Sequence, residues 1–112
     1  TIKILNGAVT AAKLDNYTNS LTSSGYQKFP GGLIIQWGVT ARTAATTTCT
    51  FPLAFSSGNC YSITLTTYNA TGSGGGSTTP LLMTLPSAAT TGFDVGTASA
   101  QTHISWMAIG TI

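Results

Sequence analysis

From Gly25 onward, hydrophobic and polar residues alternate along the chain, which is the pattern of β-strands with one buried face. The alternation is cleanest in residues 61–69, where Tyr61, Ile63 and Leu65 are expected to point inwards. The even-numbered residues from 62 to 68 are expected on the opposite face, which contacts water. We therefore predict a strand whose last aromatic residue, Tyr68, lies on the solvent-facing side.

Further short segments rich in β-branched and aromatic residues are separated by turn residues and predict the other strands. They span residues 33–40, 46–51, 81–85, 92–97 and 103–109, with a weaker candidate at 1–5. No segment repeats its apolar positions with the period of a helix, so little helix is expected. Short strands joined by turns predict an all-β fold, an antiparallel β-sandwich.

The first 24 residues differ from the rest of the chain. They carry three of the six charged side chains and show only weak periodicity, and residues 19–24 have the composition of a linker. We therefore divide the chain into an N-terminal segment, 1–24, and a β-sandwich domain, 25–112.

Two strands carry tryptophans beside aliphatic residues. Trp37 is expected to share its face with Leu33 and Ile35, and Trp106 to share its face with Ile104. We predict that both indoles pack in the core and do not form platforms for sugars. Segment 103–109 is apolar on both faces, which is typical of a central strand or of a strand at a subunit interface.

Charged residues make up only 5% of the chain, whereas an average soluble domain has about 25%. The surface is therefore covered by hydroxyl groups, hidden against other copies of the chain, or both. Clustered Lys and Arg are absent, which argues against nucleic acid as a partner. No stretch of the length needed to span a membrane is continuously apolar, so no membrane insertion is expected.

Titratable residues are too few for most catalytic or metal sites. The only carboxylate side chains are Asp15 and Asp94, and His103 is the only histidine. We expect no metal, no cofactor and no enzymatic activity, unless the two aspartates meet across a trimer as a glycosidase pair.

The two cysteines are predicted to be free thiols. Cys49 shares the parity of the inward-facing Phe51, whereas Cys60 shares that of Ser62 and Thr64, on the outward face. Side chains on opposite faces do not form a disulfide.

Several motifs together resemble a known family. Residues 25–38 (GYQKFPGGLIIQWG), 51–55 (FPLAF), 60–67 (CYSITLTT) and 105–110 (SWMAIG) occur in the order seen in the C-terminal domain of tail fibres from contractile-tailed bacteriophages and prophages. Residues 6–14 resemble the end of a fibre shaft.

The resemblance implies a homotrimeric fibre tip that binds a bacterial surface receptor, often lipopolysaccharide or another envelope glycan. It also implies a place in a virion, or in a phage-tail-like bacteriocin, assembled in the host cytoplasm. Some phage fibres hold iron through histidine pairs. His103 lacks a second histidine two residues away, so we expect a core or interface histidine there. The alternative is a metal site in which His103 from each of three chains meets on the trimer axis.

A receptor contact is most plausible at the glycine-rich loop 70–79 and the aromatic residue at its base. Our candidates are Tyr68, Asn69 and Ser73, because aromatic rings stack on sugar faces while amides and hydroxyls bond sugar hydroxyls. Arg42 is a further candidate, since its planar guanidinium suits phosphate or carboxylate. The alternatives are an ordinary surface tyrosine and a solvated loop arginine.

Two other functions remain as alternatives to adhesion. One is a glycan-cleaving tailspike domain, which clustered carboxylates would favour. The other is a structural trimerisation cap or a lectin module unrelated to phage.

Overall fold

The computed structural model describes residues 5–8, 19–56, 58–70, 80–98 and 101–112. These residues form eight strands, and their only helical element is the 3-10 turn η2, Pro86–Ala88. The strands are β1 (Asn19–Ser20), β2 (Gly25–Lys28), β3 (Leu33–Ala41), β4 (Thr46–Thr50), β5 (Cys60–Tyr68), β6 (Leu81–Leu82), β7 (Gly92–Gly96) and β8 (His103–Thr111). No helix in these ranges is long and apolar enough to cross a membrane. The all-β prediction is confirmed, while the candidate strand at 1–5 falls almost entirely outside the described residues.

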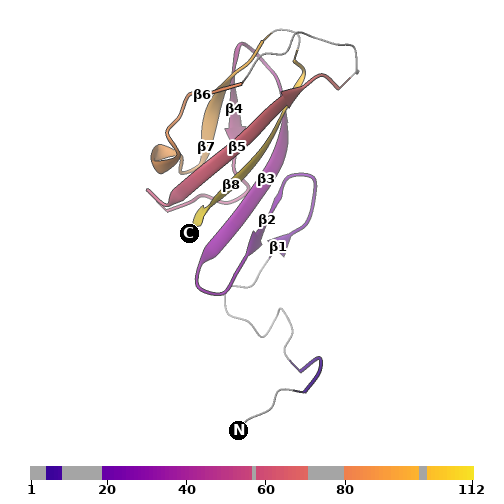
Figure 1. Cartoon of the computed structure of the whole chain (residues 1–112), viewed down its shortest axis with the longest axis vertical. Coiled ribbons are helices and arrows are strands. Elements are labelled where there is room, and N and C mark those ends of the chain that lie inside the picture. Colours follow the sequence, from indigo (N-terminus) through magenta and orange to yellow (C-terminus); the bar gives the residue numbers. More distant parts are fainter. Residues whose placement is uncertain (1–4, 9–18, 57, 71–79, 99–100) are drawn as a thin grey trace.

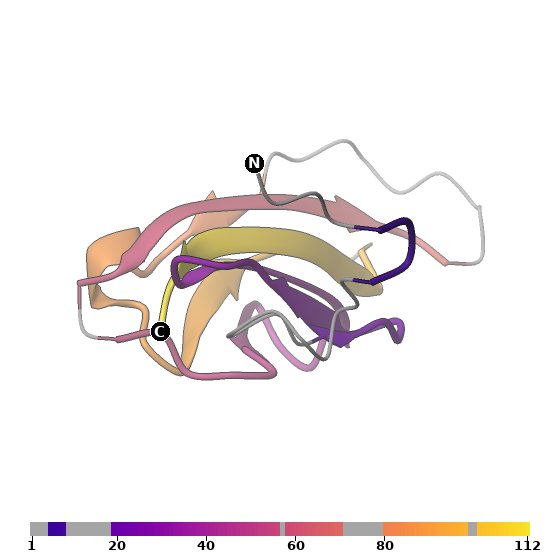
Figure 2. The same ribbon diagram turned by 90° about the horizontal axis from the view of Figure 1, so that it is seen from below.

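The strands form two antiparallel sheets that pack as a sandwich (Figures 1 and 2). The larger sheet has the order β1-β2-β3-β8-β5, and the smaller has the order β4-β7-β6. β8 therefore lies in the interior of the larger sheet, which is one of the two positions that its apolar faces predicted. β1 lies inside the predicted linker and pairs with β2, so the sheet begins at Asn19.

Strand ends differ from prediction mainly at β6. Only Leu81–Leu82 pairs with β7, although residues 81–85 were expected to form a strand. Pro86 begins the turn η2, and proline has no N–H to continue a ladder.

An aromatic cluster fills the space between the sheets. Phe51 lies 4.8 Å from Phe55 and 5.5 Å from Phe93, measured between ring centroids. Trp106 from β8 meets Phe93 edge to face at 5.5 Å. The core position predicted for Trp106 is thus confirmed.

The prediction that Trp37 packs in the core is wrong. Ile34, Gln36 and Gly38 form the buried face of β3, and Trp37 is half-buried on the opposite face. Its indole N–H donates to the carbonyl of Thr22, 2.9 Å away, which fastens the turn before β2 onto the sheet. Alternation defines two faces of this strand, but it did not show which face the second sheet covers.

Gln36 is completely buried and uses its side-chain amide to hold a loop. Its Nε2 donates to the carbonyl of Leu53 at 2.8 Å, and its Oε1 accepts from the N–H of Leu53 at 2.8 Å. The side-chain amide of Gln36 thus makes the two backbone hydrogen bonds that a neighbouring strand would otherwise make with Leu53, in the segment between β4 and β5.

A β-bulge at the start of β5 overturns the orientation predicted for Cys60. The register with β8 shifts between Cys60 and Ser62, which places Cys60 in the core and leaves Tyr61 60% exposed. The extra residue of a bulge breaks the strict alternation on which the prediction rested. Both cysteines are nevertheless free, as predicted.

Candidate functional site

Tyr68 and His103 form an aromatic pair at one end of the larger sheet. They are cross-strand partners at the end of β5 and the start of β8. Their rings stack with centroids 5.3 Å apart and an interplanar angle of 16°. Tyr68 is 38% exposed and lies on the face away from the core, as predicted. The pair therefore places a partly exposed tyrosine ring, backed by the imidazole of His103, at the end of the larger sheet.

Thr102 fixes this pair from the preceding position. Its N–H donates to the carbonyl of Tyr68 at 3.0 Å, and its hydroxyl accepts from the N–H of Ala70 at 2.9 Å. The same hydroxyl lies 2.8 Å from Nδ1 of His103. Because Nδ1 is engaged there, Nε2 is the ring nitrogen left to meet a ligand.

Arg42 directly follows the last residue of β3 and lies at the same end of the domain. Its N–H donates to the carbonyl of Thr102 at 2.8 Å, so Thr102 joins the backbone of Arg42 to that of Tyr68. Its Nε donates to the hydroxyl of Thr97 at 2.7 Å, and this places the half-buried side chain on the side facing the smaller sheet.

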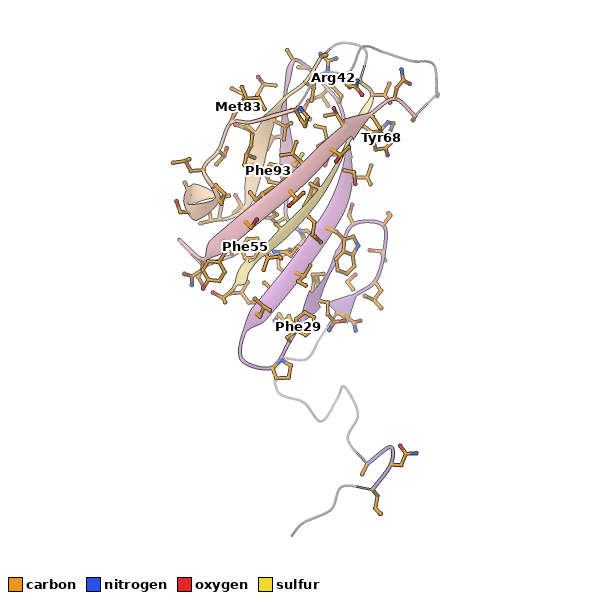
Figure 3. All side chains as sticks on the ribbon, viewed as in Figure 1. Phe29, Arg42, Phe55, Tyr68, Met83 and Phe93 are labelled. Carbon is orange, nitrogen blue, oxygen red and sulfur yellow. The ribbon has the colours of Figure 1, made fainter. Side chains whose placement is uncertain are left out.

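Arg42 and Tyr68 thus share one end of the domain (Figure 3). They lie on opposite sides of the larger sheet, because Arg42 bonds to Thr97 next to β7 whereas Tyr68 stacks on the outward-facing His103. Ala41 pairs with His103, whereas the chain enters the sheet at Asn19, level with Ile35. These two levels differ by six residues along β3, or about 20 Å at roughly 3.3 Å per residue. The candidate residues lie at the end of the sheet away from β1.

The other predicted residues are only partly described. Asn69 follows Tyr68 directly and is half-buried. Ser73, with residues 71–79 of the glycine-rich loop, lies outside the described residues. The placement of Ser73 stays a prediction.

Sequence analysis missed Thr97, Thr102 and the role of His103 at this end. His103 is half-buried on the outer face of the sheet and contacts Tyr68, so the structure does not place it in the core. Nothing in the sequence distinguished Thr97 and Thr102 from the other threonines, of which the chain has 22 in total. His103 was detectable only through its pairing with Tyr68, which requires the strand register.

Carboxylates lie elsewhere in the described part of the chain. Asp94 lies on β7 and accepts a hydrogen bond from the hydroxyl of Thr48 at 2.6 Å. Asp15 is outside the described residues, so its distance from Asp94 stays untested. Within the described ranges, no three His, Cys, Asp or Glu side chains group as metal ligands.

The two thiols are buried and suited to packing. Burial raises the pKa of Cys49, an effect that the charge of Asp94 reinforces and a hydrogen bond with Thr40 partly opposes. Burial also raises the pKa of Cys60, against a smaller opposing effect of a backbone hydrogen bond with Ser62. A raised pKa disfavours the reactive thiolate.

A second surface feature is the apolar outer face of the larger sheet. It is defined by β3 and β8 side chains that point away from the core, namely Leu33, Ile35, Trp37, Val39, Met107 and Ile109. Met107, at its centre, is 45% exposed. The β5 residues beside it are Ser62, Thr64 and Thr66, and no Lys, Arg, Asp or Glu of the described strands lies on this face.

Comparisons with known proteins agree on one kind of domain. The family model "Putative tail fiber protein gp53-like, C-terminal" matches residues 28–111. A structure of an N-truncated R2-type pyocin tail fibre has 30% sequence identity and a TM-score of 0.66, over 83% of this chain and 36% of that chain. No curated protein matches the sequence.

Two further structures, of pyocin fibres from P. aeruginosa, match the same domain. The R2 fibre has 30% identity and a TM-score of 0.65, over 83% of this chain and 25% of that chain. The R1 fibre has 27% identity and a TM-score of 0.61, over 83% of this chain and 27% of that chain. The match thus covers about a quarter to a third of each of these three solved chains.

Proposed function

Because the chain belongs to the gp53-like family of C-terminal tail fibre domains, we propose that it forms the tip of a tail fibre and adheres to a glycan of the bacterial envelope. Lipopolysaccharide is the glycan we favour. The fibre is part of a phage virion or of a phage-tail-like particle, and residues 1–24 lead from its shaft to the tip.

The observation that carries this proposal is the stacked pair Tyr68–His103 at the end of the sheet away from β1. Sugar rings present C–H faces that pack on aromatic rings, and their hydroxyl groups need polar partners nearby. Thr102, Asn69 and the remaining ring nitrogen of His103 supply such groups beside the pair. Binding residues commonly lie on loops and strand ends that a rigid scaffold positions.

We propose further that three copies assemble around the fibre axis. The apolar outer face supports this, because contiguous apolar surface on a domain usually marks an interaction site. In a trimer, weak glycan sites are repeated, and the effective concentration of the second and third contacts raises the overall avidity.

Binding to immobilised host lipopolysaccharide tests the proposed function. Tyr68→Ala is expected to reduce binding by up to about tenfold, as loss of an aromatic contact of about 0.5–1.5 kcal/mol does. Tyr61→Ala is the matched control, because Tyr61 is an exposed tyrosine on the same strand, at its opposite end. Equal binding by Tyr68→Ala and the wild type, with both folded and of the same mass, contradicts the site.

The same experiment separates the alternative functions. Release of shortened saccharide from the lipopolysaccharide would establish cleavage, as expected of a tailspike domain. If the protein neither binds nor cleaves lipopolysaccharide or whole cells, a structural cap is the function that remains.

A further inference from the structure

Arg42 is a cation that has no carboxylate partner among the residues that the structure describes. Among the described residues the only acidic side chain is Asp94, whose carboxylate accepts from Thr48, and no ion pair joins it to Arg42. Arginine is normally paired when it is withdrawn from water, since removing a charge from water costs free energy. An unpaired, half-buried guanidinium is therefore a candidate for a ligand contact.

The position of this guanidinium is fixed at two points. The backbone N–H of Arg42 donates to the carbonyl of Thr102, and Nε of its side chain donates to the hydroxyl of Thr97. Thr97 is itself anchored, because its N–H donates to the carbonyl of Ala45 at 2.8 Å. With Nε engaged, the two terminal nitrogens remain to form the paired N–H donors that match a carboxylate or a phosphate.

The location of Arg42 links it to the glycan site. Thr102 forms backbone hydrogen bonds with both Arg42 and Tyr68. Only Thr102 therefore lies between Arg42 and Tyr68 at this end of the larger sheet. Tyr68 faces outwards and Arg42 faces the smaller sheet, so one monosaccharide does not touch both. An oligosaccharide that crosses the end of the sandwich does.

Resting on the proposed function, we propose that Arg42 forms an oxyanion subsite, so that the glycan recognised by this tip carries a carboxylate or a phosphate. The charged group lies on the terminal nitrogens of Arg42, and a neighbouring sugar ring lies on Tyr68 and His103.

The test is a saccharide array that presents each oligosaccharide in three forms: neutral, with a uronic acid, and with a phosphate. The wild type is expected to bind one acidic form about tenfold more tightly than its neutral counterpart, as expected for charge-assisted hydrogen bonds. The uronate and phosphate arms identify which anion is recognised.

Arg42→Met is expected to abolish this preference while retaining binding to the neutral form. Lys28→Met is the matched control, because it removes one positive charge from β2, where Lys28 pairs with Ile34 at the end of the sheet away from Arg42. Arg42→Lys retains the charge but loses the planar fork and is expected to lose most of the preference. It serves as the second variant if Arg42→Met does not fold.

The outcomes separate this inference from the proposed function. Equal binding of acidic and neutral forms by the wild type, or an unchanged preference in both Arg42 variants, overturns the subsite but leaves adhesion intact. No binding by the wild type to any saccharide overturns both.

Discussion

The indole of Trp106 lies directly against Gly38, its cross-strand partner on β3. A Cβ atom at position 38 would lie 2.5 Å from Cζ2 and 2.8 Å from Cε2 of the ring. The glycine and the tryptophan therefore form one packing unit that joins β3 to β8 in the core.

Gly38→Ala is expected to lower the free energy of unfolding by about 2–3 kcal/mol, because the buried ring must move to admit a methyl group. Gly96→Ala is the control, since the nearest atom to its added Cβ lies 3.5 Å away, an ordinary contact. Denaturant unfolding of both variants at one protein concentration provides the measurement. An equal loss in both would show that position 38 is not specially crowded.

Gln36→Leu is expected to destabilise the domain by about 2–6 kcal/mol. The substitution removes both hydrogen bonds between Gln36 and Leu53, so the N–H and the carbonyl of Leu53 lose their partners. Each unpaired group costs about 1–3 kcal/mol of stability. Gln27→Leu, on the neighbouring strand, removes only more exposed hydrogen bonds and should cost less than about 1 kcal/mol. If the two variants unfold at the same denaturant concentration, the amide of Gln36 does not hold the loop.

Met107→Glu is expected to dissociate the proposed trimer into single chains, because it places a charge at the centre of the apolar outer face. Met83→Glu makes the same change at a methionine that is 55% exposed beside the smaller sheet and should leave the assembly intact (Figure 3). Light scattering at micromolar concentration gives both masses. A single-chain mass for the wild type would refute the trimer itself.

Stability is expected to fall at alkaline pH through the two thiols. Burial raises the pKa of Cys49 and of Cys60 above the usual 9.0, so the folded state holds these protons more tightly than the unfolded state. The resulting stabilisation is present below about pH 9 and is lost as the pH rises through the folded pKa values.

Unfolding measured from pH 7 to pH 11 tests this dependence against Cys49→Ala and Cys60→Ala. Each variant should show a shallower alkaline decline than the wild type, although it is less stable at neutral pH. Identical slopes in all three proteins would exclude the thiols as the cause.

The sequence by itself determined the all-β sandwich and the main strands β3, β4, β5, β7 and β8, but not the short strands β1 and β2. These features follow from alternation, turn residues and apolar content, all of which act between near neighbours in the chain. The motif that contains Gln36, Trp37 and Gly38 also pointed to the family before any pairing was known. Tyr68 was placed on the solvent-facing side because its strand keeps its period up to that end.

Only the tertiary structure decided which face of each strand is covered and which distant residues meet. The second sheet covers Gln36 and leaves Trp37 outside, and a bulge turns Cys60 inwards, because packing and register outweigh local alternation. The link from Arg42 through Thr102 to Tyr68 joins residues from three strands and their flanking loops. Such contacts depend on long-range pairing, which a pattern of neighbouring residues does not contain.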